Sequence, residues 1–208
     1  MNIEIKISKK PVDYESAINF LERRVEKVFN KEAPELIWIL EHSNVYTCGT
    51  SGKTEELLNQ NKFPIFKTSR GGKWTYHGSG QKIVYFVLNL NNREKKIKKL
   101  INDIEKWIIS ILNNYQIKAK NDKKNIGIWI RVKDQDFKIA AIGIKVKKWI
   151  AFHGFALNIN VDKNNYKGII PCGINDKGII NFCELRNIPK EDSFNKIIVK
   201  KFKEIFIN

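Results

Sequence analysis

Apolar residues recur every three or four positions in three segments of this 208-residue chain, a spacing that predicts three amphipathic helices. The segments are residues 11–30, 93–115 and 191–206. In the first segment either Asp13 or Ser16 is placed to cap the helix N-terminus, because both side chains can accept a hydrogen bond from a free backbone amide. A shorter fourth helix is expected at 54–60, after a Gly/Ser/Thr loop that follows the strand ending near residue 42.

Short runs rich in β-branched and aromatic residues predict the strands. These runs are residues 1–7, 35–42, 64–67, 82–90, 125–132, 137–142, 145–149 and 152–160. The last four are joined by short turns at 134–136 and 147–148, the pattern of a meander with one buried face. Since strands form hairpins and helices fall between groups of strands, the predicted class is α+β, and the length fits one domain over residues 1–208.

The chain carries 38 Lys and Arg residues against 22 Asp and Glu residues, a formal net charge of +16. A charge of this sign favours acidic partners, which include nucleic acid, an anionic membrane and acidic proteins. The basic residues are 32 lysines and 6 arginines spread along the chain, whereas nucleic-acid sites more often have clustered arginines. A nucleic-acid-binding module therefore remains a weak alternative, and we expect neither nucleic acid nor a membrane as a partner.

Cys48, Cys172 and Cys183 are an odd set at wide spacing, which predicts neither a disulfide framework nor a metal site. The first seven residues alternate like a strand and lack the features of a signal peptide. No stretch reaches the roughly 18 apolar residues of a membrane span. We therefore expect a cytoplasmic protein without a metal.

A glycine-rich segment, residues 69–81, has four glycines within ten residues. Glycine lets the backbone approach a ligand closely and expose its amide donors, and Arg70 and His77 would add polar contacts. The spacing matches neither a Walker loop nor a dinucleotide motif. A binding loop and a hairpin whose glycines only form turns are both compatible with the pattern.

Cys172 lies between Pro171 and Gly173, a context that predicts a turn from which a thiol can project. A thiol with a free pKa of about 8.5 needs a neighbouring base or cation to react near neutral pH. Lys138 can act as either, and it opens an apolar run that ends at Gly143. On residue type alone, however, Cys172 is more often a small buried apolar residue and Lys138 a solvated charge, so these alternatives stay open.

Four blocks of sequence, in this order, resemble the octanoyl-(acyl-carrier-protein):protein octanoyltransferases, also called lipoyl(octanoyl) transferases. The blocks are Arg-Gly-Gly with Thr-Tyr-His-Gly at 70–78, Lys-Ile-Ala-Ala-Ile-Gly at 138–143, Phe-His-Gly-Phe-Ala-Leu-Asn at 152–158 and Pro-Cys-Gly at 171–173. The matching segments run from residue 41 to residue 173. The resemblance implies the biotin/lipoate-protein-ligase-like α+β fold, a single domain with a mixed sheet flanked by helices.

The resemblance also implies a reaction and a set of site residues. Cys172 would carry the octanoyl group as a thioester and Lys138 would deprotonate it, with no cofactor. The donor would be octanoyl-acyl carrier protein, and the acceptors the lipoyl domains of 2-oxoacid dehydrogenase E2 subunits and the glycine cleavage H protein. The substrate-binding residues would be Arg70, Gly71, Gly72, Lys73, Trp74, Thr75, Tyr76, His77, Ala141, Ile142, Gly143, His153, Gly154, Phe155 and Ala156. Backbone amides near two expected turns, at 71–72 and at 143, are candidate donors to the oxyanion.

Two residues depart from the family pattern. Ser79 stands where the family usually has Pro, and Trp74 where a small β-branched residue is common, which bears on the rigidity of the loop. Two other enzymes of this fold remain as alternatives. One is an ATP-dependent lipoate-protein ligase, although an adenylating enzyme has no use for Cys172, and the other is a lipoyl amidotransferase.

Overall fold

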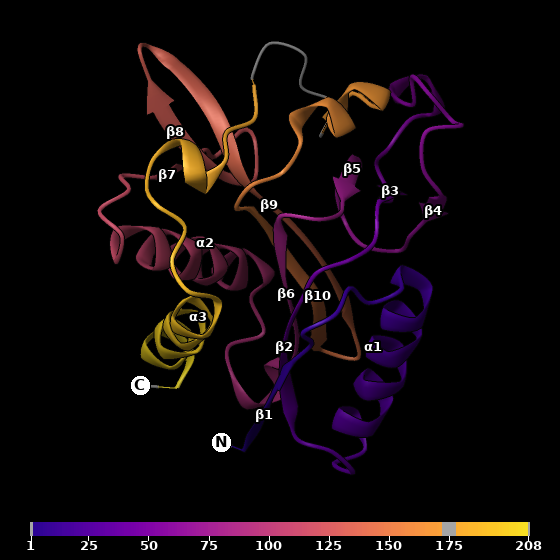
Figure 1. Ribbon diagram of the computed structural model, residues 1–208. Helices are drawn as coiled ribbons and strands as arrows, with labels where there is room; N and C mark the ends of the chain where they lie inside the picture. Colours follow the sequence, from indigo (N-terminus) through magenta and orange to yellow (C-terminus); the bar gives the residue numbers. More distant parts are fainter. Residues whose placement is uncertain (1, 172–177, 208) are drawn as a thin grey trace.

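The computed structural model describes residues 2–171 and 178–207, and within these residues a mixed sheet of seven strands forms the centre of the molecule (Figure 1). The strand order is β1-β2-β6-β10-β9-β8-β7. Only the β1–β2 pair is parallel in this described sheet. The strands are β1 (Ile3–Ile7), β2 (Glu35–Leu40), β6 (Gln81–Asn89), β7 (Lys120–Asn121), β8 (Ile128–Val132), β9 (Gln135–Lys147) and β10 (Ile150–Asn158).

A second, smaller sheet stands beside the first in the described part of the chain, with strand order β4-β3-β5. Its strands are β3 (Val45–Cys48), β4 (Ile65–Lys67) and β5 (Trp74–His77). A cluster of buried aromatic side chains, including Tyr46, Tyr76 and Tyr166, packs against it. The glycine-rich segment is therefore not a simple hairpin, since β5 pairs with β3 of the small sheet and β6 belongs to the large one.

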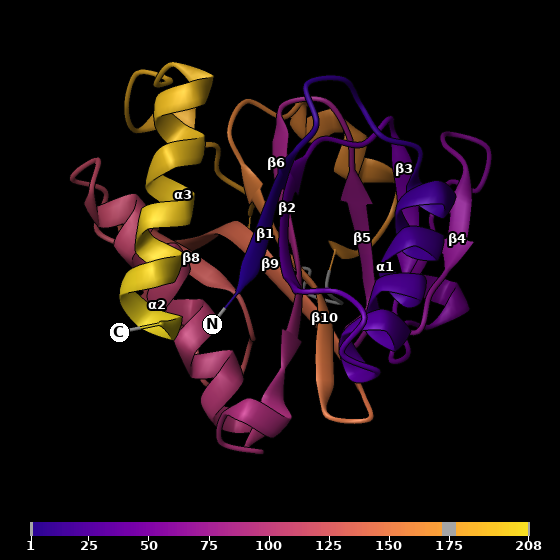
Figure 2. The ribbon, with the colours of Figure 1, turned by 90° about the horizontal axis from the view of Figure 1, so that it is seen from below.

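Helices cover both faces of the large sheet (Figure 2). Helix α1 (Tyr14–Phe29) lies on one face, and α2 (Ile97–Asn113) and α3 (Glu191–Phe206) lie on the other. Because side chains alternate along a strand, β2 contributes Leu36, Trp38 and Leu40 to the α1 side and its other apolar residues to the α2/α3 side. This layering confirms the predicted α+β class.

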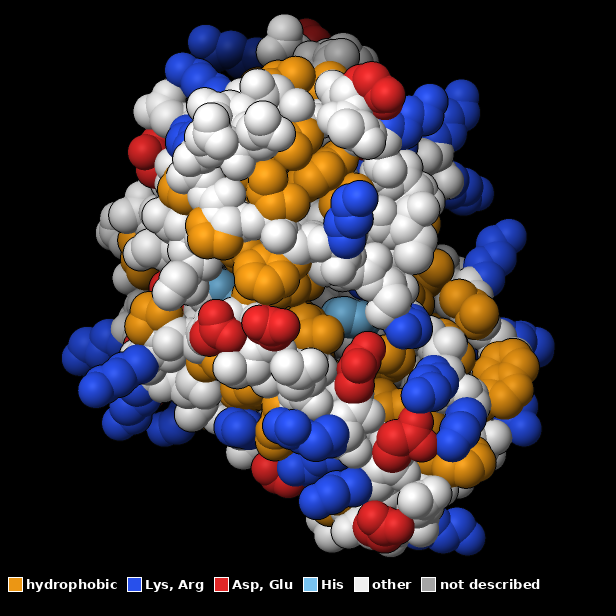
Figure 3. All heavy atoms as spheres, turned by 90° about the vertical axis from the view of Figure 1, so that its right-hand side faces the viewer, with side chains coloured by type: hydrophobic (Ala, Val, Ile, Leu, Met, Phe, Trp, Pro, Cys, Tyr) orange, Lys and Arg blue, Asp and Glu red, His pale blue; other side chains and the backbone are white. Residues whose placement is uncertain are grey.

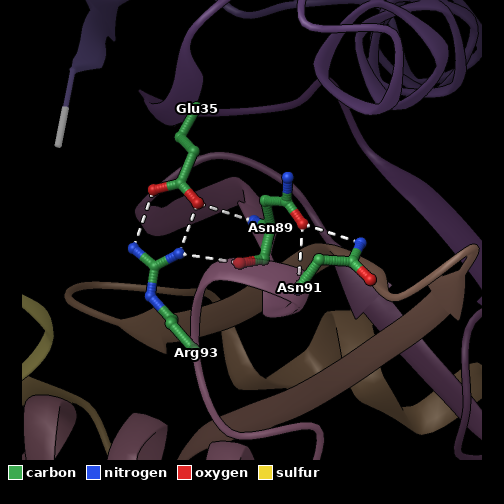
Figure 4. A network of polar contacts seen from close by, with 4 residues as sticks. All are labelled: Glu35, Asn89, Asn91 and Arg93. Atoms are coloured by element: carbon green, nitrogen blue, oxygen red, sulfur yellow. Dashed lines mark hydrogen bonds and ion pairs between the residues drawn. The ribbon is translucent and has the colours of Figure 1, made fainter.

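A polar network joins the start of β2 to the end of β6 (Figure 4). The carboxylate of Glu35 accepts from both terminal nitrogens of Arg93, with 2.7 Å between Oε2 and Nη2, and from the Asn89 backbone N–H at 2.6 Å. Asn89 in turn accepts from the backbone N–H of Asn91. A bidentate pair of this kind, with both side chains largely buried, fixes the chain where it leaves the sheet and approaches α2.

The helix predictions are confirmed for three segments. Helix α3 has the predicted bounds, whereas α2 is shorter than predicted at both ends. Asp13 is the residue that caps α1, through a 2.8 Å hydrogen bond from the Ser16 backbone N–H to its carboxylate. The short helix predicted at 54–60 is wrong, because only a 3₁₀ turn, Thr54–Glu56, forms there. None of the helices within the described ranges is long and apolar enough to cross a membrane.

The strand predictions erred at Gly143. The runs at 137–142 and 145–149 are one strand, β9, which ends at Lys147, so Gly143 lies in the middle of a strand and not in a turn. A glycine in a strand often marks a close approach of another backbone, and a Cβ at Gly143 would lie 3.3 Å from the carbonyl oxygen of Gly71. The meander itself is confirmed, with its turns at residues 133–134 and 148–149, where φ is positive.

Candidate active site

A cavity of about 550 Å³ is lined by residues from both sheets, from α1 and α2, and from the loops at residues 51, 70–73 and 124–126. This volume is within the range of small-molecule sites in proteins. Apolar side chains of Ile83, Ile101, Ile142 and Phe155 contribute to its wall. Most of the site residues predicted from the sequence also line the cavity: Arg70, Gly71, Gly72, Lys73, Thr75, His77, Lys138, Ala141, Ile142, Gly143, His153, Gly154, Phe155 and Ala156.

Two predicted site residues do not line this cavity. Trp74 and Tyr76 alternate with Thr75 and His77 along β5, so their side chains lie on the opposite face of that strand. Both belong to the buried cluster under the small sheet, where the Trp74 indole N–H donates to the Lys53 carbonyl at 2.7 Å. The contiguous run 70–77 predicted from sequence thus divides between a cavity-facing set and a core-facing set.

The side chain of Arg70 holds the glycine-rich loop in place at the cavity edge by hydrogen bonds. Its Nη2 donates to the carbonyl and the hydroxyl of Thr47, at 3.0 and 2.7 Å, and to the carbonyl of Lys73 at 3.1 Å. Its Nη1 donates to the Gly71 carbonyl at 3.0 Å. Arg70 is buried, and no carboxylate within the described ranges forms an ion pair with it. The guanidinium therefore fixes the loop and leaves a positive charge beside the cavity.

The glycine-rich loop is held against strand β9 and against the turn that follows β3. The Gly71 backbone N–H donates to the carbonyl of Ile144 in β9 at 2.9 Å, which takes up one of the amides that sequence suggested as an oxyanion donor. A Cβ at Gly49 would lie 2.3 Å from the Gly72 carbonyl oxygen, so the turn after β3 can approach the loop only because position 49 has no side chain. Ser51 completes the contact by donating its N–H to Gly72 at 3.0 Å.

Lys138 lies in β9 with only 8 % of its surface exposed and lines the cavity. Its Nζ donates to the Ile126 carbonyl at 3.3 Å. Its backbone N–H donates to the carbonyl of Gly178 at 2.9 Å, and its carbonyl accepts from the N–H of Ile180 at 3.1 Å. The structure thus joins Lys138 to the chain that follows residue 177.

Cys172, the predicted nucleophile, lies outside the described residues. The described chain before it is anchored by Ile170, whose N–H donates to the Glu56 carbonyl at 2.7 Å. Of the other two cysteines, Cys48 is buried under the small sheet, and burial raises the pKa of its thiol. A thiol with a raised pKa stays protonated at neutral pH, which makes Cys48 a poor nucleophile.

All three histidines of the chain are buried, and burial is the main cause that lowers each pKa, to about 4 for His42 and to about 3 for His77 and His153. They are therefore neutral at pH 7. On the face seen in Figure 3, histidine appears as small areas near hydrophobic side chains, and Lys and Arg are spread over the edges and the lower part of the face. The histidines thus offer neutral hydrogen-bonding groups and no positive charge.

Hydrogen bonds assign two of the three imidazole tautomers. His42 Nδ1 contacts the Val12 carbonyl at 2.7 Å, so Nδ1 carries the proton and Nε2 accepts from the Tyr85 hydroxyl at 2.9 Å. His77 donates from Nδ1 to Gln81 Oε1 at 2.7 Å, which leaves its Nε2 as an acceptor. Neither nitrogen of His153 has a partner within the described part of the chain, although His153 is 1 % exposed and lines the cavity.

Several cavity residues were missed by the sequence reasoning. Tyr14 comes from the start of α1, and Ile126 comes from the loop before β8. Ile83 and Tyr85 lie two positions apart on β6. Because side chains alternate between the two faces of a strand, this spacing was the signal that could have placed them on the same face. Tyr14 and Ile126 gave no such signal, because only the tertiary fold brings them to the cavity.

No group of three His, Cys, Asp or Glu side chains that could hold a metal ion occurs in the part of the chain that the structure describes. Among the described residues that line the cavity there is no Asp or Glu, and the charged ones are Arg70, Lys73, Lys124 and Lys138. Positive charge and apolar surface are thus the two chemical properties that this site offers a ligand.

The fold and this site define a lipoyl protein ligase A/B catalytic domain, the family whose model matches residues 13–206. An octanoyltransferase from Rickettsia peacockii is 45 % identical over 197 residues, covering 93 % of this chain and 94 % of that protein. An octanoyltransferase from Ehrlichia chaffeensis is 41 % identical over 207 residues, covering 99 % and 97 %. The chain belongs to the octanoyltransferase family and is an acyltransferase of lipoate biosynthesis, which confirms the resemblance predicted from the four sequence blocks.

Solved structures show the same fold at much lower identity. A T. acidophilum protein solved with bound lipoic acid is similar with a TM-score of 0.77 at 13 % identity, covering 99 % of this chain and 86 % of that chain. This likeness confirms the biotin/lipoate protein ligase-like arrangement of a mixed sheet and helices.

Proposed function

We propose that this octanoyltransferase transfers its acyl group through a thioester on Cys172. The Cys172 thiolate attacks the carbonyl carbon of an octanoyl group carried by acyl carrier protein, and the bond to the carrier sulfur breaks. A lysine amine of a lipoyl domain then attacks the Cys172 thioester, which forms an amide and releases the thiol. Exchange between thioesters is nearly isoenergetic and the amide is more stable, so the cycle consumes no nucleotide.

Lys138 has the role of proton carrier in this proposal. It accepts the proton of the Cys172 thiol and returns it to the departing carrier thiolate. The position of Lys138 is the observation that carries the proposal, since its side chain lines the cavity and its backbone N–H bonds to Gly178, the first described residue after the segment with Cys172. A buried lysine without a carboxylate partner in residues 2–171 and 178–207 is suited to such work.

In this proposal the cavity binds the acyl group and stabilises the negative charge that develops in the reaction. Its apolar wall suits an eight-carbon chain, because burying each methylene contributes about 0.8 kcal/mol. The Arg70 charge beside the loop favours the tetrahedral oxyanion, and the Gly72 amide is the remaining loop donor once Gly71 is bonded to Ile144. The net charge of +16 suits acidic partners. Acyl carrier protein is acidic, and so are the lipoyl domains of E2 subunits and of the glycine cleavage H protein.

Intact-mass analysis tests the proposal. The protein is mixed with octanoyl-acyl carrier protein without ATP, and we expect one octanoyl adduct that peptide mapping places on Cys172. Cys172→Ser should form no adduct, whereas the matched control Cys183→Ser, at a partly exposed cysteine that does not line the cavity, should form it normally. Adding a lipoyl domain should then move the adduct to a lysine of that domain.

Two results would contradict the proposal. A Cys172→Ser enzyme with full transfer activity would remove the thioester intermediate. An enzyme that modifies lipoyl domains only when free octanoate and ATP are supplied would be a ligase, the alternative that shares this fold.

A further inference from the structure

The side chain of Lys138 is oriented by an aromatic ring on the neighbouring strand. Its Nζ lies 4.7 Å from the centroid of the Trp129 ring, and Trp129 is 1 % exposed. At this distance the ring face attracts an amine that carries positive charge, an interaction worth roughly 0.5 to 2 kcal/mol. The backbone bonds of Lys138 to Gly178 and Ile180 fix its main chain, but they leave the direction of the side chain to these neighbours.

A β-bulge puts Trp129 and Lys138 opposite each other. Ile128 pairs with Ala140 and Trp129 pairs with Lys138, so Ile139 is an extra residue in β9 at this point. A bulge re-aims the side chains beside it, and bulges are frequent next to active sites. Without the extra residue, Trp129 would be paired with Ile139, and the lysine would not meet the indole.

Trp129 also holds the loop that supplies the other contact of the lysine. Its indole N–H donates to the Asn125 carbonyl at 2.9 Å. The next carbonyl in that loop, on Ile126, accepts from Lys138 Nζ at 3.3 Å. The same side chain therefore contacts the amine directly through its ring and fixes the loop that accepts a hydrogen bond from the amine.

Gly127 leaves the space that this arrangement needs. Its φ is +137°, a conformation that other residues rarely adopt. A Cβ there would lie 3.1 Å from Lys138 Cε and 3.3 Å from Nζ, and 2.9 Å from the Ala140 carbonyl oxygen. Any side chain at position 127 would thus push the amine from its place or displace the strand.

We propose that Trp129 is a positioning residue that holds the Lys138 amine where the reaction needs it, with Gly127 providing the space. This inference rests on the proposed role of Lys138 in ionising Cys172. Trp129 acts through Lys138, and it is not one of the described residues that line the cavity. Removing it should therefore weaken the ionisation of Cys172 without changing the binding of the donor.

The first test measures how fast iodoacetamide alkylates Cys172 as a function of pH, with peptide mapping to separate Cys172 from Cys48 and Cys183. We expect Lys138→Met to move the midpoint of this profile to higher pH, and Trp129→Leu to move it part of the way. In acyl transfer, Trp129→Leu should lower kcat about tenfold, as expected for the loss of a cation–π contact together with a loop anchor, and leave KM for octanoyl-acyl carrier protein within about twofold. Trp129→Phe retains a ring face and should lose about threefold.

A double-mutant cycle separates positioning from a general structural effect. In the Lys138→Met background, Trp129→Leu should cause no further loss of kcat, because the group that it positions is absent. An additional tenfold loss there would overturn the inference. Trp107→Phe is the matched control for the loss of a buried indole, since the Trp107 N–H also donates to a backbone carbonyl, that of Ile198, under α3. It should leave the pH profile unchanged.

The outcomes distinguish this inference from the proposed function. If the wild-type enzyme forms no octanoyl adduct on Cys172, the proposed function fails and this inference fails with it. If the adduct forms and Lys138→Met shifts the profile, but folded Trp129→Phe and Trp129→Leu both keep the wild-type profile and kcat, only the role of Trp129 is overturned. Should Trp129→Leu not fold, the Phe variant and the Trp107 control still decide.

Discussion

The imidazole of His153 stacks on the ring of Phe152, with ring centroids 4.8 Å apart and an interplanar angle of 19°. Consecutive residues of a strand normally point to opposite faces of the sheet, so two neighbours in β10 should not be able to stack. The exception arises because His153 has a φ of +68°, which turns its side chain to the same side as Phe152 and towards Tyr85. Strand β10 therefore places its imidazole beside the cavity through a strained backbone.

The first prediction concerns this strain. His153→Gly should unfold at a higher urea concentration than His153→Ala, by about 1 kcal/mol in the free energy of unfolding, because only glycine adopts a positive φ without cost. In an ordinary strand the order is the reverse, since alanine is the better strand residue. Both variants lose the same imidazole, so the comparison isolates the backbone. An alanine variant more stable than the glycine variant would show that position 153 is relaxed.

The periodicity of apolar residues predicted those helices and strands that have one buried face. The bounds of α3 and the meander of β8, β9 and β10 followed from it, because an amphipathic face is visible in sequence. Gly143 was placed in a turn because glycine usually interrupts strands, and nothing in the local sequence indicates that a distant loop at Gly71 approaches it. The small sheet was also missed, because β3 and β5 are only four residues long and each pairs with a segment that is distant in the sequence.

The candidate site was predicted mainly from the family resemblance. The motifs brought together residues of the 70–77 run, β9 and β10, and the structure places most of them around one cavity. What the motifs could not give is the direction of each side chain. Arg70 is predicted to contact a ligand, and the structure adds that its terminal nitrogens bind the loop backbone and Thr47. The role inferred for Trp129 depends on a bulge, which no pattern of apolar residues predicts.

The second prediction concerns the pH dependence of stability. The three histidines have pKa values of about 4 or about 3 in the folded protein, against 6.5 for an unperturbed histidine, so the unfolded chain binds protons first as pH falls. Stability should therefore be complete above about pH 6.5 and decline below it, by up to about 1.4 kcal/mol per histidine for each pH unit down to pH 4. Urea unfolding at pH 7, 6 and 5 measures this slope.

A variant assigns the slope to the histidines. His77→Gln should reduce the loss of stability between pH 6 and pH 5 by about a third, because one of three buried groups no longer takes up a proton. Carboxylates contribute little in this interval, since their unfolded pKa values are about 4. A stability that is constant from pH 7 to pH 5 would mean that the folded protein binds these protons as readily as the unfolded chain does.

The third prediction concerns the network of Figure 4. Glu35→Gln should lower the free energy of unfolding by about 3 kcal/mol, because it leaves the Arg93 guanidinium without its largely buried counter-charge. The exposed pair Lys96–Glu94, at 2.9 Å, is the matched control, and Glu94→Gln should leave the free energy of unfolding almost unchanged, because solvent screens this pair. Denaturant unfolding at two salt concentrations checks both, and equal effects of the two substitutions would contradict the assigned importance of burial.

The fourth prediction compares two glycines of the cavity wall. A Cβ at Gly154 would lie 1.9 Å from the carbonyl oxygen of Val84, so β6 and β10 can pair at this point only around glycine. Gly154→Ala should therefore cost about 4 kcal/mol, an effect that is exceptional for a single methyl group. A Cβ at Gly71 meets only the Ile144 carbonyl oxygen, at 3.4 Å, and Gly71→Ala should change stability by less than about 1 kcal/mol. Thermal unfolding of the two variants measures the difference, and a Gly154→Ala protein as stable as Gly71→Ala would mean that the two strands are further apart than described.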